Sequence, residues 1–193
     1  MKKNILSLFL IIAFCAGANA QDKIYGGLRL SPNYSFFNNK IDKVNSGLGY
    51  SIGYFEVIEL SNKINLQAEI NYNTYTFVDT RQTKTTVTNR FSNLELPLMV
   101  KYRVSEGFAI GGGYQFSVLN KLFGGQTVKL KVDGQDPVTA DDLEGIKTGG
   151  YFIDANLKSG GTLVGLRILQ TSEVLYEKKS INVGLYVGFT IFK

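Results

Sequence analysis

Residues 64–77 alternate between apolar and polar side chains, reading Ile-Asn-Leu-Gln-Ala-Glu-Ile-Asn-Tyr-Asn-Thr-Tyr-Thr-Phe. Because successive side chains of a β-strand point to opposite faces, one face of this strand would be apolar and the other polar. The stretch is about twice as long as an ordinary strand, and a tilted strand needs about 9–11 residues to cross a bilayer. The alternation therefore predicts a strand that spans a membrane.

Residues 1–20 have the features of a secretory signal peptide. Lys2 and Lys3 precede an apolar run over 5–16, and Ala-Asn-Ala at 18–20 is typical of a cleavage site. We expect cleavage before Gln21, which leaves residues 21–193 as a single barrel domain. The only cysteine, Cys15, leaves with the signal, so the remaining chain has no disulfide. A lipid-modified Cys15 is the alternative, but it would need a small residue in place of Phe14.

Composition limits the classes of partner. No later stretch has 18 uninterrupted apolar residues, so we expect no transmembrane helix after the signal. The formal charge of +5 falls by two when Lys2 and Lys3 are removed. The remaining excess is too small and too scattered to indicate nucleic-acid binding, so we expect no nucleic-acid partner.

Eight strands are predicted after the signal, at 24–36, 47–57, 64–77, 91–104, 108–119, 147–158, 162–170 and 180–192. The connections after the second, fourth and sixth strands are tight and rich in turn-forming residues, whereas the others are longer and polar. This order is typical of barrels in the bacterial outer membrane. We therefore predict an all-β, eight-stranded antiparallel up-and-down transmembrane β-barrel, with short periplasmic turns and longer extracellular loops.

The polar strand faces carry both signs of charge. Eight strands enclose a space that side chains just fill, and opposite charges there would satisfy one another. We predict a plugged lumen with a charge network of Arg29, Glu69, Glu95, Lys101, Arg103, Asp154 and Arg167. The alternative is a solvated face with scattered charges.

Aromatic residues near the strand ends indicate two girdles at the levels of the lipid headgroups. The expected outer girdle contains Tyr34, Phe36, Phe37, Phe77 and Phe91, and the inner one Tyr54, Tyr102 and Phe108.

Two local departures from regular strand are also expected. Pro97 cannot donate to a strand ladder, so it should mark a bulge in the fourth strand. Residues 139–145, Thr-Ala-Asp-Asp-Leu-Glu-Gly, offer an N-cap and a stopping glycine, which indicates one short helical turn.

The last strand carries a pattern similar to the C-terminal assembly signal of outer-membrane barrels. Asn182 and Gly184 would face inward, while Val187 and Phe189 would face lipid. The chain runs four residues beyond Phe189, which departs from that pattern. The resemblance implies that barrel-assembly machinery is a partner during insertion.

Residues 94–103 read Leu-Glu-Leu-Pro-Leu-Met-Val-Lys-Tyr-Arg, which resembles a segment typical of the PorT-type outer-membrane barrel family. Glycine-rich stretches at 26–30 and 111–114 also fit that family. The resemblance implies an eight-stranded outer-membrane barrel. Because the founding member assists a secretion system, it also implies a secretion-system partner as one alternative.

Much catalytic chemistry is missing from the sequence. There is no histidine, and no cysteine after the signal, so histidine triads and thiol sites are excluded. We expect no enzyme activity, no cofactor and no metal site. Two alternatives stay open: a proton shared by Glu69 and Glu95, and calcium at the acidic third long loop, although its spacing fits no established calcium loop.

Basic residues lie in or near the expected outer loops. Attraction to anionic groups suggests lipopolysaccharide contacts at Lys40, Lys43, Arg81, Lys84 and Arg90, and a solvated basic rim is the alternative.

Three functions compete. The leading one is a non-enzymatic integral outer-membrane protein, surrounded by outer-membrane lipids, that serves envelope structure or surface interaction through its outer loops. The second is an accessory of a protein secretion or assembly machine. The third is a soluble periplasmic barrel that binds a small apolar ligand, which would require the apolar faces to point inward.

Overall fold

The computed structural model describes residues 24–37, 43–81, 85–117, 125–132, 138–141, 149–175 and 178–192, and only the backbone at 125–132, 138–141, 172–175 and 178. The predicted signal peptide lies outside these residues and stays a prediction. Among the residues that are described, no helix is long and apolar enough to cross a membrane.

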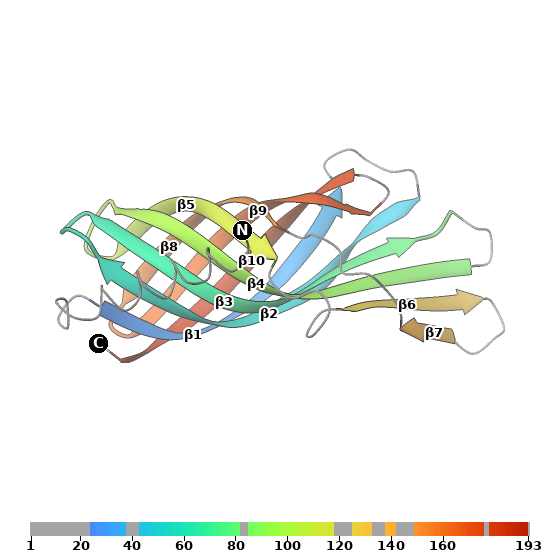
Figure 1. The fold of residues 1–193 in the computed structure, drawn as a ribbon, viewed down its shortest axis with the longest axis horizontal. Helices are drawn as coiled ribbons and strands as arrows, with labels where there is room; N and C mark the ends of the chain where they lie inside the picture. The colour runs from blue at the N-terminus through green and yellow to red at the C-terminus, as the bar shows by residue number, and fades with distance from the viewer. Residues whose placement is uncertain are drawn as a thin grey trace, which may run out of the picture.

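Eight of the described strands form one closed antiparallel ring, which confirms the predicted fold class (Figure 1). They are β1 (Ile24–Phe37), β2 (Val44–Glu59), β3 (Ile64–Asp79), β4 (Thr85–Arg103), β5 (Phe108–Ser117), β8 (Gly150–Ser159), β9 (Thr162–Leu175) and β10 (Lys178–Phe192). Each pairs with its neighbour in this order, and β1 pairs with β10 to close the ring.

The remaining two strands lie outside the ring at one end. β6 (Gly125–Val132) pairs with the part of β4 that projects beyond β5, and β7 (Val138–Asp141) pairs with β6. Figure 1 shows this hairpin beside the projecting ends of β3 and β4. The predicted helical turn at 139–145 is therefore wrong over its first three residues, because Thr139, Ala140 and Asp141 pair with β6 instead. Residues 142–145 are not described.

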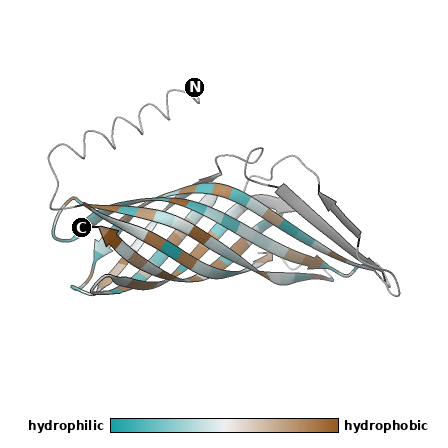
Figure 2. Cartoon of the chain, turned by 90° about the horizontal axis from the view of Figure 1, so that it is seen from below, coloured by the Kyte–Doolittle hydropathy of each residue, from teal (hydrophilic) through white to brown (hydrophobic). Residues whose placement is uncertain are grey.

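Hydrophobic and hydrophilic residues alternate along the wall strands (Figure 2), and their exposed fractions place the apolar ones outside the ring and the polar ones inside. Leu28 and Ile70 are 51% and 50% exposed, whereas Arg29 and Glu69 are 4% and 2% exposed. In water such an exterior would be costly, because the apolar surface runs along every wall strand. It fits a barrel in lipid and contradicts the soluble barrel with an apolar interior.

The tight turns lie at the same end as the start of β1 and the end of β10. At one of them Leu60 N–H donates to the Ile64 carbonyl at 2.9 Å, and at another Gly160 has φ +57°, which favours glycine. β1, β3 and β5 end at the opposite end of the ring. In outer-membrane barrels the short turns face the periplasm.

Two other expectations need correction. The connection after the seventh wall strand is short, since β9 runs to Leu175 and β10 begins at Lys178, and these two residues pair in the extended ladder. Pro97 does not produce a bulge, because β4 keeps a single register with β3 on both sides of it. Instead, the ladder between β3 and β4 is interrupted between the pairs Ala68↔Leu98 and Asn71↔Glu95, because Pro97 has no backbone N–H to donate.

Candidate functional site

Glu69 lies at the centre of the lumen, between two arginines from other strands. Its carboxylate accepts hydrogen bonds from Arg29 Nη1 at 2.9 Å and from Arg167 Nη1 and Nη2, both at 2.8 Å. Gln67 and Asn71, on the same face of β3, donate to it at 2.6 and 2.7 Å. One carboxylate thus joins β1, β3 and β9 across the barrel.

Asp154 on β8 extends this arrangement toward the periplasmic end. It forms ion pairs of 2.9 Å with both Arg167 Nη2 and Lys101 Nζ, and it accepts a hydrogen bond from the Tyr186 hydroxyl at 2.8 Å. Lys101 also donates to Asn156 Oδ1 at 2.7 Å. We call the five residues Arg29, Glu69, Lys101, Asp154 and Arg167 the lumen ion cluster; each is at most 5% exposed.

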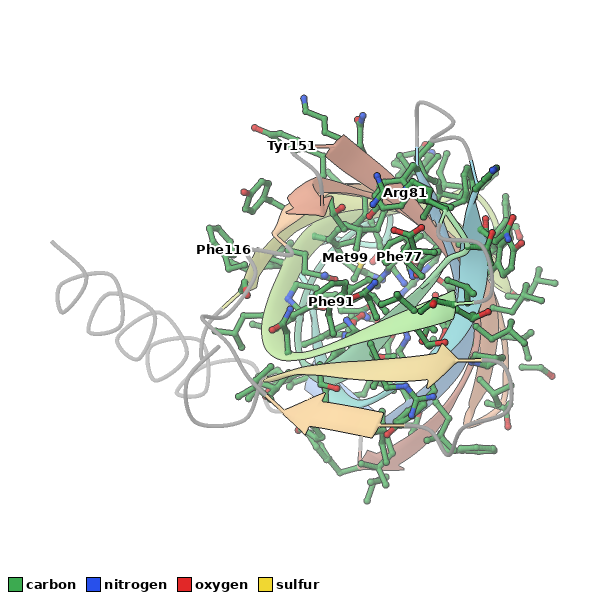
Figure 3. The ribbon with its side chains drawn as sticks, turned by 90° about the vertical axis from the view of Figure 1, so that its right-hand side faces the viewer. Phe77, Arg81, Phe91, Met99, Phe116 and Tyr151 are labelled. Carbon is green, nitrogen blue, oxygen red and sulfur yellow. The ribbon has the colours of Figure 1, made fainter. Side chains whose placement is uncertain are left out.

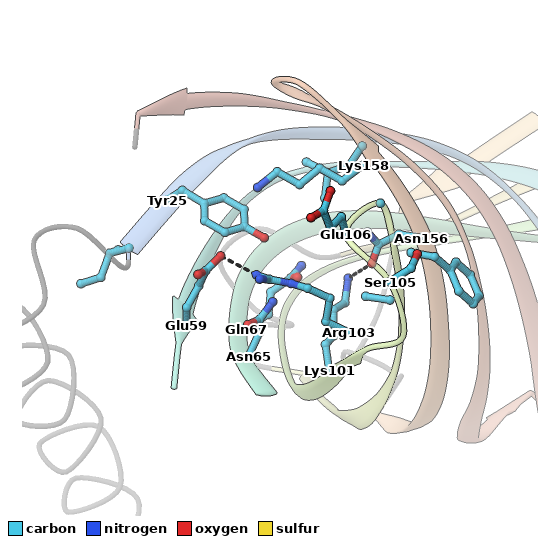
Figure 4. A pocket seen from close by; sticks show the side chains of 15 residues that line it. Tyr25, Glu59, Asn65, Gln67, Lys101, Arg103, Ser105, Glu106, Asn156 and Lys158 are labelled. Atoms are coloured by element: carbon cyan, nitrogen blue, oxygen red, sulfur yellow. Dashed lines mark hydrogen bonds and ion pairs between the residues drawn. The ribbon is translucent and has the colours of Figure 1, made fainter. Parts of the chain in front are cut away.

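Two further residues of the predicted charge network lie apart from the cluster. Glu95 accepts hydrogen bonds from Tyr75 and Asn73, toward the outer side of the cluster. Arg103 lies at the periplasmic mouth, where its Nη2 contacts Glu59 Oε1 at 2.6 Å (Figure 4). The structure therefore brings together five of the seven predicted residues.

An apolar layer fills the lumen on the outer side of the lumen ion cluster. We call it the aromatic layer; its buried members are Phe37, Tyr75, Phe77, Phe91, Met99, Phe152 and Leu169. Figure 3 looks into the outer end and shows Phe77, Phe91 and Met99 inside the ring, with Phe116 and Tyr151 outside. The rings of Phe37 and Phe77 stack at 4.5 Å.

The outer girdle was predicted in part incorrectly. Phe37, Phe77 and Phe91 share the inward face of their strands with the polar residues, so they belong to the aromatic layer. The exposed aromatic residues near the outer ends include Tyr34, Tyr50, Phe116 and Tyr151. Sequence reasoning also missed that Tyr186 lies in the lumen, where it is buried and donates to Asp154. Tyr186 stands two residues after Gly184, so alternation places it on the inward face with Asn182 and Gly184.

A polar pocket of about 350 Å³ opens at the periplasmic mouth (Figure 4). We call it the mouth pocket. Its charged and polar lining includes Tyr25, Glu59, Asn65, Gln67, Lys101, Arg103, Glu106, Asn156 and Lys158. Sequence reasoning had singled out only Lys101 and Arg103 of this set, because most of the others stand at strand ends, where alternation is a weaker guide.

Three of the five outer basic residues are described, and all three lie near the outer ends of β2, β3 and β4. Lys43 is exposed and has φ 58°, Arg90 is exposed on β4, and Arg81 forms an ion pair of 2.6 Å with Asp79. Lys40 and Lys84 lie outside the described residues. The possible calcium loop lies mostly outside them too, and elsewhere in the described chain no three His, Cys, Asp or Glu residues come together as metal ligands.

The C-terminal pattern has the predicted orientation. Asn182 is buried and donates to Ser35 Oγ at 2.9 Å, and Gly184 faces Ser31 in the lumen. Val187 and Phe189 are exposed on the lipid face. That these residues act as an assembly signal stays a prediction.

Comparison with known proteins gives a family and a set of similar folds. The model of a family described as outer membrane protein beta-barrel domain matches residues 19–192. Two structures of Ail, the attachment invasion locus protein of Yersinia pestis, have TM-scores of 0.52 and 0.51, and the second is in complex with the heparin analogue sucrose octasulfate. Each is 11% identical and covers 88% of this chain and 98% of that chain. No curated protein matches.

Proposed function

This chain belongs to the outer membrane protein beta-barrel domain family, and on that premise we propose that it is a non-enzymatic barrel with a closed lumen. We propose that it works through its outer projection, which consists of the outer ends of β3 and β4 and the β6–β7 hairpin. The family match confirms the location expected from the sequence, which is the bacterial outer membrane. Outer-membrane lipids therefore contact the apolar exterior.

The lumen contents carry the proposal of a closed barrel. The lumen ion cluster and the aromatic layer lie one above the other, and both consist of buried side chains. The cavity beside Arg29, Asn33 and Asn71 has a volume of only about 20 Å³. That is room for about one water molecule, so no continuous water path supports ion flow there.

Conductance measurement tests the closed lumen. The protein is refolded, its insertion is checked by a gel shift between boiled and unboiled samples, and it is added to planar lipid bilayers beside a porin as positive control. We expect no unitary current steps from inserted protein. Stable, reproducible steps would overturn the proposal.

The outer projection supports a role in surface interaction. β3 and β4 extend beyond the ring, and the β6–β7 hairpin pairs with the projecting end of β4 (Figure 1). Lys43 and Arg90 are exposed there. We propose that the outer basic residues contact lipopolysaccharide phosphates; the sulfated ligand bound to the similarly folded Ail supports an anionic ligand class.

Lipopolysaccharide retention through purification tests this contact. Replacing Lys40, Lys43, Arg81, Lys84 and Arg90 by Gln should lower the amount retained per protein. Lys63→Gln, at an exposed periplasmic turn, is the matched control and should retain the wild-type amount. Equal retention by the fivefold variant and the control would defeat the proposal.

A second candidate function is an accessory role in protein secretion, which the resemblance of residues 94–103 to the PorT-type family favours. Barrel-assembly machinery is the partner proposed for insertion. Crosslinking in intact cells, followed by purification of the barrel, tests both. Reproducible capture of secretion components favours the accessory role, whereas their absence favours the envelope role.

The proposal of no catalysis is supported by the missing histidine and by the absence of cysteine after residue 15. Assays of the purified protein for esterase, phospholipase and protease activity should show only background. Robust turnover would refute this part of the proposal.

A further inference from the structure

A groove in the outer wall of the barrel takes no part in the closed lumen or the outer projection. It crosses β4, β5, β8 and β9 and has a volume of about 450 Å³, and we call it the wall groove. Pockets for small ligands span about 300–1,000 Å³, so the wall groove has room for part of an organic molecule. Its exposed side walls are apolar or aromatic, and consist of Val100, Tyr102, Ile110, Ile153, Leu166 and Ile168.

Small residues on β5 and β8 make room for the wall groove. Gly112 pairs with Val100 on one side and with Ile153 on the other, so two larger side chains stand beside an outward position that has none. Among the described residues, a Cβ atom on Gly112 would meet only the Phe152 carbonyl oxygen within 4 Å, at 3.3 Å. Ala155 is flanked by larger residues on both neighbouring strands in the same way.

The wall groove lies at the depth of the periplasmic leaflet. Tyr102 stands three residues before Ser105 in one tight turn, and Ile153 stands seven residues before Gly160 in another. With a rise of about 3.3 Å per residue and a strand tilt of about 40°, these residues are about 8 and 18 Å above the turns. The headgroup layer is about 5–8 Å thick and half of the hydrocarbon core about 15 Å. The groove therefore runs from the headgroup level toward the bilayer midplane.

The lining selects a hydrocarbon chain. Asp154 also borders the wall groove, but its carboxylate points into the lumen, where it pairs with Lys101 and Arg167. The polar member of the exterior lining is Tyr102, which stands at the headgroup end. Because the barrel lies in the outer membrane, acyl chains surround this wall, and a gap left empty would forfeit van der Waals contacts.

We propose that one acyl chain of a phospholipid from the periplasmic leaflet lies in the wall groove. The chain passes over Gly112 and Ala155, and its ester group lies beside Tyr102. In the groove the chain contacts side chains below it and on both flanks, whereas on an even wall it contacts them from one side. The barrel thus holds one phospholipid at a fixed place on its circumference.

Photolabelling in bilayers tests the proposal. The protein of residues 21–193 is refolded in phospholipid vesicles that contain a phosphatidylethanolamine with a diazirine midway along one acyl chain. Ile70 is the matched site outside the groove, since it is also an exposed isoleucine and stands seven residues after Lys63 in a tight turn. Relative to exposed area, labelling of Ile153 should exceed that of Ile70 by at least about threefold, because the chain has more contacts in the groove.

Filling the groove should remove this excess. Ala155→Leu places a larger side chain on the floor, so labelling of Ile153 should fall to the level of Ile70. Ala68→Leu is the matched control, because Ala68 is also a partly exposed alanine on the lipid face but lies outside the wall groove. This variant should be labelled like the wild type.

Three results would overturn the proposal. They are labelling of Ile153 and Ile70 in proportion to exposed area alone, equal labelling of Ile153 in the two variants, and a detergent-resistant dimer that is lost in Ala155→Leu, which would place a second copy in the groove. The comparison of Ile153 with Ile70 is made on wild-type protein, so it decides the proposal even if a variant does not fold. Conductance is a separate readout, so failure here leaves the closed lumen standing.

Discussion

Replacing Glu69 by Gln removes the carboxylate that holds two arginines together in the lumen. Arg29 and Arg167 both lie within 3 Å of the carboxylate oxygens, so in the variant they would face an amide in place of a negative charge. Breaking a buried ion pair from one side costs about 3–5 kcal/mol, because the charge left behind stays buried without compensation. Here that charge is Arg29, since Arg167 keeps its ion pair with Asp154. We expect Glu69→Gln to lower the free energy of unfolding by that amount.

Glu59→Gln is the matched control, since it makes the same chemical change in a carboxylate–arginine pair. The Glu59–Arg103 pair is partly exposed, so its loss should cost about 0–1 kcal/mol. The double variant Glu69→Gln with Arg167→Gln should cost less than the sum of the two single variants, because the residues are coupled.

The assay is urea unfolding of the protein refolded in lipid vesicles, followed by the mobility of unboiled samples on gels and by far-ultraviolet circular dichroism. The chain has no tryptophan, so intrinsic tryptophan fluorescence is not a readout. The reasoning is refuted if Glu69→Gln costs no more than Glu59→Gln.

Three further predictions use the same unfolding assay. Phe77→Ala should cost about 3–5 kcal/mol, because Phe77 is fully buried in the aromatic layer, whereas Tyr151→Ala on the exterior should cost far less; equal losses would argue against a packed lumen. Ile153→Arg, on the exposed apolar face, should cost up to about 2–4 kcal/mol if it lies near the bilayer midplane, and no loss would contradict its contact with lipid. Gly113→Ala should impair folding, because a Cβ atom would come within 1.9 Å of a carbonyl on the neighbouring strand, while Gly161→Ala meets nothing closer than 4.0 Å and should fold normally.

Alternation predicted the wall of the barrel from sequence. Every expected strand is present. The inward faces of β1, β3 and β4 are those of Arg29, Glu69 and Lys101, and residues an even number of positions from each of these share its face. Alternation is a local property of the backbone, so the face on which each side chain lies can be predicted without knowledge of which strands are neighbours.

The pairing inside the lumen was less predictable. Asp154 and Arg167 are cross-strand partners, which follows from a short turn, but Glu69 meets Arg167 across the barrel, which depends on tilt and closure. Phe77 and Phe91 were assigned to lipid because aromatic residues near strand ends usually form girdles. Phe77 stands an even number of residues from Glu69, and Phe91 an even number from Lys101, so alternation predicts that both point into the lumen. That signal was the better one.

Labels attached at two adjacent positions of β1 test the central claim most directly, that apolar side chains contact lipid while polar ones fill the lumen. Residues 21–193 contain no cysteine, so Leu30→Cys and Ser31→Cys each give a single site for a fluorophore. Leu30 is exposed on the exterior, and Ser31 is buried inside. In vesicles, lipids with quenchers on their acyl chains should quench the label at residue 30 strongly and the label at residue 31 weakly. Equal quenching, or the reverse order, would contradict the account.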